Sequence, residues 1–187
     1  MHHLAIAAIA TVLFIGAGAG AVTNIGTPSQ AQDDLLNPVV AGQAMLADET
    51  IFDNAAKSPE HTVFVAELKQ AGLADTLKGK GPFTVFAPTD AAYAALSPQA
   101  RADAMKSAGY LVVRGRFDSK TLLRLIGENE GQAQLKTLKG GTITATMNGP
   151  TNIALMDGKG DVADISIYDI YQSNGVIQVV DKVMLPG

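Results

Sequence analysis

Residues 74–96 read ADTLKGKGPFTVFAPTDAAYAAL, and this stretch contains the clearest strand signal in the chain. Its centre, Pro82 to Ala87, is short, rich in β-forming residues and bounded by glycine and proline, which predicts a strand. Thr89 and Asp90 follow and offer side-chain oxygens where a helix over 91–96 needs its first amide groups capped. The stretch therefore predicts a strand that leads directly into a helix.

Helical patterns dominate the sequence on both sides of this stretch. Apolar residues recur at three-to-four spacing from Thr50 to Ser58, and a second helix, capped by Thr62, follows at once. Downstream, the same reasoning predicts two further helices with one strand between them. These are a helix over Pro98–Ser107, a strand over Tyr110–Arg114 and a helix over Ser119–Gly127.

The last third of the chain changes to strand patterns. Two alternating runs, 142–147 and 152–156, are joined by a turn, and a second hairpin joins 164–171 to 176–184. The second turn is Ser173-Asn174-Gly175, in which Asn-Gly is expected to supply the positive backbone angles of a tight turn. The final strand is apolar on both faces, so we expect it to lie deep inside the fold.

The order of elements indicates the fold class. Helices come first and strands later, with one early and one middle strand that must pair with the late ones, which predicts an α+β fold rather than a repeating βαβ wind. The sequence shows no internal repeat, so we expect a single domain, which we place at 46–187.

The N-terminus resembles an export signal. Residues 1–31 contain no Asp, Glu, Lys or Arg, and the apolar run Leu4–Ile15 precedes a small-residue stretch ending in Ser29-Gln30-Ala31. We predict a signal peptide over 1–31 and a flexible lead-in over 32–45. A retained membrane anchor over Leu4–Val22 is the alternative, which three glycines in this run disfavour. Both interpretations place the domain outside the cytoplasm, secreted or periplasmic.

Composition excludes several classes of function. The formal net charge is −4 and the sequence contains no run of Lys and Arg, so nucleic acid is not an expected partner. The chain has no cysteine, which removes disulfides, thiolate nucleophiles and thiolate metal sites. The chain has ample apolar material for a packed core.

No set of residues for catalysis or metal binding can be assembled from the sequence. His61 is the one histidine outside the signal, and we expect it on the surface at a helix start. Residues 157–161 (DGKGD) lack the later ligands of a calcium loop and predict a plain turn. Gly79-Lys80-Gly81 precedes a strand, so no helix N-terminus stands behind it to hold phosphate. Glu128 and Glu130 fit a solvated surface. We therefore expect no catalytic residue, metal or cofactor.

Two segments resemble the signature boxes of the fasciclin-like domain family. Residues 73–96 resemble the first box, and residues 173–186, SNGVIQVVDKVMLP, resemble the second. Tyr110 stands where the family has a central Tyr-His motif. The resemblance covers about residues 46–187, and it implies a β-wedge of two sheets flanked by helices in secreted, surface-binding modules.

The resemblance also implies candidate contact residues. An Asp-Ile pair before the second box and the neighbourhood of the Tyr-His motif are implicated in receptor binding in animal relatives. The matching residues are Asp169, Ile170 and Tyr110, although an alternating strand would by itself place Ile inward and Asp outward. Leu111 and Gln178 replace histidines usual in the family.

Two functions from different classes remain open, with hydrolase activity a distant third. The first is an exported, monomeric adhesion or interaction module that binds a cell-surface or matrix protein or polysaccharide without catalysis or membrane insertion of the mature chain. The second is an extracytoplasmic carrier of a small apolar or lipid-like ligand. Thr89, Asp90 and Asn174 are expected to serve folding rather than ligand contact.

Overall fold

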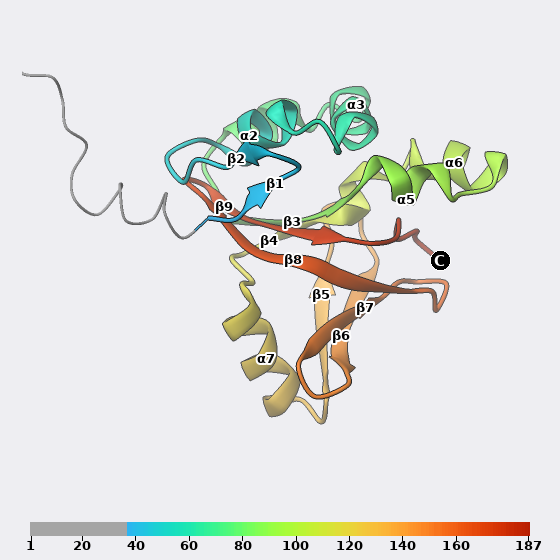
Figure 1. Ribbon diagram of the computed structural model, residues 1–187. Coiled ribbons are helices and arrows are strands. Elements are labelled where there is room, and N and C mark those ends of the chain that lie inside the picture. The colour runs from blue at the N-terminus through green and yellow to red at the C-terminus, as the bar shows by residue number, and fades with distance from the viewer. Residues whose placement is uncertain (1–36) are drawn as a thin grey trace, which may run out of the picture.

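The computed structural model describes residues 37–187, so the predicted signal peptide lies outside the described residues. Helices occupy most of the N-terminal half and strands most of the C-terminal half, which confirms the α+β prediction (Figure 1). The helices are α2 (Ile51–Lys57), α3 (Thr62–Gln70), α4 (Ala74–Lys78), α5 (Asp90–Ala94), α6 (Pro98–Ala104), the 3-10 turn η1 (Ala108–Leu111) and α7 (Ser119–Glu128). The strands are β1 (Val39–Val40), β2 (Gln43–Ala44), β3 (Phe83–Pro88), β4 (Val112–Arg114), β5 (Gln132–Lys136), β6 (Thr142–Asn148), β7 (Asn152–Met156), β8 (Val162–Gln172) and β9 (Gly175–Val180).

Seven strands form one strongly bent sheet in the order β4-β3-β9-β8-β7-β6-β5. The long strand β8 pairs with β7 through its first residues and with β9 through the rest, with two register shifts between Ile165 and Ile170. These irregularities bend the sheet into two halves that share β8, as expected for a wedge. A bridge between Val113 and Thr137 joins the outer strands β4 and β5, so the sheet is nearly closed.

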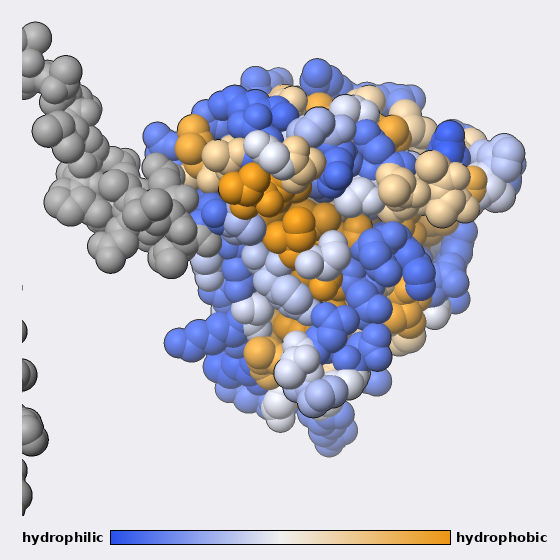
Figure 2. Space-filling model, viewed as in Figure 1, coloured by the Kyte–Doolittle hydropathy of each residue, from blue (hydrophilic) through white to orange (hydrophobic). Residues whose placement is uncertain are grey.

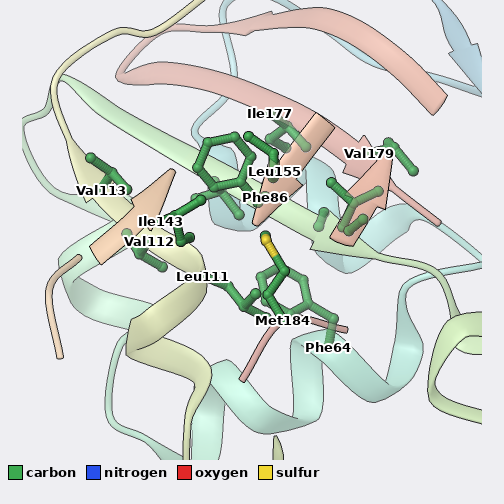
Figure 3. Packing of buried hydrophobic residues seen from close by; sticks show 14 of the residues in the cluster. Phe64, Phe86, Leu111, Val112, Val113, Ile143, Leu155, Ile177, Val179 and Met184 are labelled. Carbon is green, nitrogen blue, oxygen red and sulfur yellow. The ribbon is translucent and has the colours of Figure 1, made fainter. Parts of the chain in front are cut away.

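The centre of the sheet is the parallel pair β3 and β9, in which all six residues of each strand are buried. Apolar side chains from both halves of the sheet pack here against α3 and the C-terminal segment. Figure 3 shows Phe86 and Ile177 from this pair in one cluster with Leu155, Phe64 and Met184. Burial on both faces explains why every side chain of β9 except that of Gln178 is apolar.

Two neighbouring residues after β3 cap two different helices. The Thr89 hydroxyl accepts a hydrogen bond from the Ala92 amide at 3.3 Å and begins α5, as predicted. The Asp90 carboxylate instead accepts from the amides of Thr62 and Val63, at 3.3 and 2.9 Å, at the start of α3. Thr62 does not cap this helix itself. Asp90 thus ties α3 to the end of β3, and these bonds hold its pKa low although partial burial opposes ionisation.

Asn174 connects three elements at the other end of the β3–β9 pair. Its side-chain oxygen accepts from the Ile51 amide at 2.9 Å, and its side-chain nitrogen donates to the carbonyls of Leu77 and Gly79 at 2.7 and 2.9 Å. Its backbone carbonyl accepts from the Phe83 amide at 3.0 Å. Asn174 therefore fixes the start of α2 and the end of α4 against the β8–β9 turn.

The predicted positive backbone angles at Asn174 and Gly175 are wrong, because neither residue has a positive φ. Gly175 is needed for a different reason. A Cβ atom at this position would lie 2.0 Å from the Phe83 carbonyl oxygen. The glycine allows β9 to start in close contact with β3.

The expected surface position of His61 is also wrong. His61 is 4% exposed, and its Nδ1 lies 2.7 Å from the Ser58 hydroxyl. Burial lowers the pKa of His61, and the nearby Asp90 charge opposes this shift. The turn Ser58–His61 folds inward because α2 and α3 pack directly on one another, which no local sequence signal shows.

Three segments differ from the predicted elements. Strands β1 and β2 lie before the expected start of the domain at Leu46 and form a hairpin. Asn37 bonds to both backbone groups of Tyr171. Strand β5 was not predicted. Strand β9 ends at Val180 rather than Met184, although Met184 is buried without being in a strand.

A buried acid pairs with a buried phenol between α3 and α5. Glu67 is completely buried, and its Oε2 accepts a hydrogen bond from the Tyr93 hydroxyl at 2.5 Å, while its Oε1 has no partner among the described residues. Burial raises the pKa of Glu67 to about 7, against the opposing effect of the Tyr93 hydrogen bond. The native state therefore favours the protonated acid near neutral pH.

We expect Asn174→Ala to lower the free energy of unfolding by about 3 kcal/mol, because three hydrogen bonds between separate elements are lost. Chemical denaturation followed by circular dichroism measures this change. Asn129→Ala is the matched control: its side chain makes one local bond, to the Leu125 carbonyl at 2.7 Å, so its loss should cost less than about 1 kcal/mol. Equal effects of the two substitutions would contradict the role given to Asn174.

We expect the stability of the protein to fall as pH rises through the raised pKa of Glu67. The contribution is fully present below 4.5, the ordinary pKa, and lost above about 7, a change on the order of 3 kcal/mol. Glu67→Gln removes this loss, so the variant should exceed the wild type in stability at pH 8 but not at pH 4.5. Glu130→Gln, at an exposed residue, controls for the change in net charge. Parallel stability curves for Glu67→Gln and wild type across this range would contradict the assignment.

Candidate functional site

An open groove of about 610 Å³ lies at the end of the molecule where β8 turns into β9. Its basic side chains come from two segments: Lys78 and Lys80 lie two residues apart between the end of α4 and β3, and Arg116 follows β4. We call it the basic groove; its lining is Thr50, Lys78, Gly79, Lys80, Gly81, Pro82, Arg116, Ser173 and Asn174. The sequence contains no run of Lys and Arg, but the fold brings Arg116 to the same groove as Lys78 and Lys80.

The three cations differ in how far they are neutralised. The Lys78 ammonium is 3.8 Å from an Asp53 carboxylate oxygen and 5.2 Å above the Phe52 ring. Lys80 is exposed and has no ion pair within residues 37–187. Arg116 donates to the Gln172 carbonyl at 3.2 Å but forms no ion pair with a carboxylate within the same residues. The groove therefore carries excess positive charge on a chain whose formal net charge is −4.

The shape of the groove is fixed by backbone packing. A Cβ atom on Gly81 would lie 1.9 Å from the Asn174 carbonyl oxygen, so a glycine is required there. The Asn174 side chain holds the Gly79 carbonyl, and the Gly115 amide donates to the Pro82 carbonyl at 2.9 Å. The loop that presents Lys80 is thus held on both sides.

Asp169 forms a polar corner next to the groove. Its carboxylate accepts from the Ser119 amide at 2.7 Å and the Gln178 side-chain nitrogen at 2.9 Å, and it also accepts from the Ser119 hydroxyl. Its backbone has a φ of 57°, and its amide donates to the Gln178 side-chain oxygen at 2.9 Å. We call Asp169, Ser119, Gln178 and the adjacent Tyr171 the Asp169 corner.

Electrostatics link the corner to the basic groove. The Arg116 guanidinium lies 5.9 Å from the centre of the Tyr171 ring. Burial and the charges of Asp169 and Asp118 raise the pKa of Tyr171. Burial opposes ionisation of Asp118, but hydrogen bonds from Thr121 and the charge of Arg116 hold its pKa below the ordinary value. Arg116 therefore lies between the two, because it lines the groove and contacts Tyr171 of the corner.

The other two candidate residues are buried. Ile170 is 1% exposed and faces the interior on the side away from the Asp169 carboxylate. Tyr110 is 0% exposed, and its hydroxyl donates to the Thr142 carbonyl at 2.7 Å. The structure places Asp169 and Ile170 back to back on β8, and Tyr110 shares no hydrogen-bond partner with Asp169.

The two positions that lack the histidines of the family have different surroundings. Leu111 is buried within the apolar cluster (Figure 3). Gln178 is completely buried, and its amide both accepts from Asp169 and donates to Asp169 and to the Phe117 carbonyl. A neutral amide therefore supports the Asp169 corner without a titratable group.

The acidic side chains considered in the sequence analysis either bond within the fold or lie exposed on the surface. Both Asp157 oxygens accept backbone amides, from Lys159 and Asp161 within the turn and from Leu185 in the C-terminal segment. Glu128 is exposed and pairs with Arg124, and Glu130 is exposed. Within residues 37–187, no group of three or more His, Asp or Glu side chains could hold a metal ion.

The interior offers little room for a ligand. An enclosed apolar cavity beside Ser58, His61 and Ile170 has a volume of about 10 Å³. Cavities that bind drug-sized molecules are on the order of 300–1,000 Å³.

No helix within the described part of the chain is long and apolar enough to cross a membrane.

The sequence places Lys78 and Lys80 two residues apart but Arg116 far from them, so the basic groove was not predicted. The strand pairing explains how they meet. Phe83 and Arg114 are paired across the antiparallel strands β3 and β4, so the residues before β3 and after β4 must meet. That pairing alone brings Lys80 near Arg116.

Figure 2 shows the face of Figure 1 as mostly hydrophilic, with hydrophobic residues gathered beside the β1–β2 hairpin. Exposed large hydrophobic residues among the described residues are few: Val39, Leu46, Leu123 and Val162. The surface that we consider for binding is therefore the polar one formed by the groove and the corner.

Comparisons with known proteins agree with this architecture. The family model described as "Fasciclin domain" matches residues 59–186. Protein sll1483 of Synechocystis is 30% identical over 177 residues, which cover 87% of this chain and 89% of that protein. Immunogenic protein MPB70 of Mycobacterium bovis is 28% identical, over 95% of this chain and 96% of its own length.

A solved structure shares the fold. It is the FAS1 domain pair from the insect cell adhesion molecule Fasciclin I, with a TM-score of 0.62 and 15% sequence identity. The match covers 75% of this chain and 52% of that one. The bent sheet, the two signature segments and the family match lead to one conclusion: this chain belongs to the fasciclin domain family.

Proposed function

We propose that this protein is an exported adhesion or interaction module that binds a cell-surface, matrix or envelope partner and catalyses no reaction. The observation that carries the proposal is the basic groove, with the Asp169 corner adjoining it at Arg116, on a fasciclin domain. A preformed surface with fixed loops loses little conformational entropy when it binds a partner.

The arrangement of reactive groups supports binding rather than turnover. The Ser58–His61 pair is the nearest approach to a nucleophile and base, and both side chains are 4% exposed. A substrate would have to reach them through the packed interface of α2 and α3. The proposal also draws on the structural neighbour, a domain pair from an insect cell adhesion molecule.

Asp169 is the residue that we propose as the contact point of the corner. Ile170 and Tyr110 act from buried positions: Ile170 fixes β8 against the core, and Tyr110 joins η1 to β6. The carrier alternative has less support. The apolar cavity beside Ile170 has a volume of only about 10 Å³, and a larger cavity of about 380 Å³ beside α5 has charged side chains in its wall: Asp157, Asp161, Asp181 and Lys182.

Export is the second part of the proposal. We expect cleavage after Ala31, so that the mature protein begins at Gln32. Intact-mass measurement of protein recovered from the extracytoplasmic fraction tests this. A mass that retains residues 1–31 would instead favour the anchor over Leu4–Val22.

Retention of the labelled mature protein on intact cells and on washed envelopes tests adhesion. We expect saturable retention, and Asp169→Ala should reduce it about fivefold because the corner loses its acceptor for Ser119 and Gln178. Asp161→Ala, at an exposed residue of the β7–β8 turn, is the matched control. Tyr110→Phe removes only a buried hydroxyl and should retain the protein as wild type does.

Circular dichroism establishes first that each variant is folded. Retention that does not saturate with wild-type protein would overturn the adhesion proposal. Saturable retention that Asp169→Ala leaves unchanged would remove the corner from the contact surface.

A further inference from the structure

We infer that the basic groove binds a linear anionic polysaccharide, with carboxylate or sulfate groups placed at Lys78, Lys80 and Arg116. This inference rests on the proposed adhesion function and names the chemistry of its partner. It begins from the charge distribution. Three exposed cations line one groove, and the single ion pair among them, Lys78 to Asp53, is long at 3.8 Å.

The groove offers two kinds of contact for anions, a guanidinium and ammonium groups. Arg116 presents a planar guanidinium that suits a carboxylate or sulfate, and its position is held by the Gln172 carbonyl and the Tyr171 ring. Lys80 is exposed and available as a point charge. Positive groups spaced along a groove match a chain that repeats its negative charge, and they steer such a chain toward the site.

The remaining lining suits a carbohydrate better than a folded protein partner. The hydroxyl oxygens of Thr50 and Ser173 line the groove together with the backbone of Gly79 and Gly81. These are partners for sugar hydroxyl groups. Protein interfaces instead concentrate large aromatic and aliphatic anchors in their centres, and the groove lining contains none.

The concave form of the site also separates a polysaccharide from a membrane surface. Peripheral membrane attachment usually combines basic residues with apolar groups that enter the lipid interface. The exposed large hydrophobic residues of the described chain, such as Val39 and Val162, do not line the groove. We therefore commit to a soluble or matrix polyanion and treat lipid as an outcome of the test.

Direct binding of defined probes to the full-length mature protein tests the inference. The probes are alginate and dextran sulfate of matched chain length, with neutral dextran as the uncharged control. We expect saturable binding of the two polyanions, none of neutral dextran, and weakening as salt rises from about 20 to about 300 mM, because screening shortens the range of the charges. Equal binding of neutral dextran would overturn the role of charge.

Charge-neutralising variants locate the binding. The triple variant Lys78→Gln, Lys80→Gln, Arg116→Gln should bind alginate at least about tenfold more weakly than wild type. The matched control, Lys69→Gln, Lys106→Gln, Lys159→Gln, changes the net charge equally at exposed residues outside the groove and should bind as wild type does. The Lys80 side chain makes no hydrogen bond or ion pair with the rest of residues 37–187, so Lys80→Gln alone should still weaken binding about threefold, which separates loss of contact from loss of folding.

Three outcomes would overturn the inference. These are equal weakening by the two triple variants, tighter binding of phosphatidylglycerol vesicles than of alginate, and tighter binding of poly-glutamate than of alginate. The cell-retention assay keeps this inference distinct from the proposed function. Saturable cell retention without alginate binding would leave adhesion standing and reject the polysaccharide, whereas loss of both would reject the two proposals together.

Discussion

The parallel pairing of β3 with β9 is the constraint on which the rest of the fold depends. It joins residues 83–88 to residues 175–180, so the chain between them must leave β3, form the other elements and return beside it. Both strands are completely buried, and parallel strands of this kind are stable when both faces are covered. The helices cover one face of the pair. The other half of the sheet, which folds over at β8, covers the second face.

The same junction shapes the candidate site. Asn174 holds the start of β9 against α2 and α4, and it lies in the wall of the basic groove. The expectation that Asn174 serves folding is confirmed by its hydrogen bonds. The residue nevertheless has a second consequence, because the loop that it fixes is the one that carries Lys80. The Asn174 side chain therefore both stabilises the fold and fixes the position of the Lys80 charge.

The sequence predicted those elements whose local pattern matches their environment. Strands β3, β6 and β9 have strong β-forming composition or strict alternation, and each was predicted near its observed position. Strand β5 was missed although Gln132–Lys136 alternates in polarity, because the segment is short and contains no β-branched or aromatic residue. The β1–β2 hairpin has two-residue strands and depends on Asn37, whose partner Tyr171 is far away in the sequence. Such contacts leave no local trace.

The candidate site was predicted in part. Asp169 came from the family resemblance, but its role as acceptor for Ser119 and Gln178 depends on contacts across 50 and 9 residues. The burial of His61 and the gathering of Lys78, Lys80 and Arg116 follow from the packing of separate segments. Spacing along the chain could not show either of them, because charge density in space is a property of the fold rather than of any window of sequence.

The bridge between Val113 and Thr137 has a further consequence for contacts between copies of the chain. It brings the two outermost strands of the seven-stranded sheet together, and the Leu138 amide adds a bond of 2.8 Å to the Val112 carbonyl. An open sheet presents unpaired amide and carbonyl groups that recruit strands from other molecules and seed aggregation. Here part of each outer edge is paired with the other, so a strand from a neighbouring molecule has less free edge to extend.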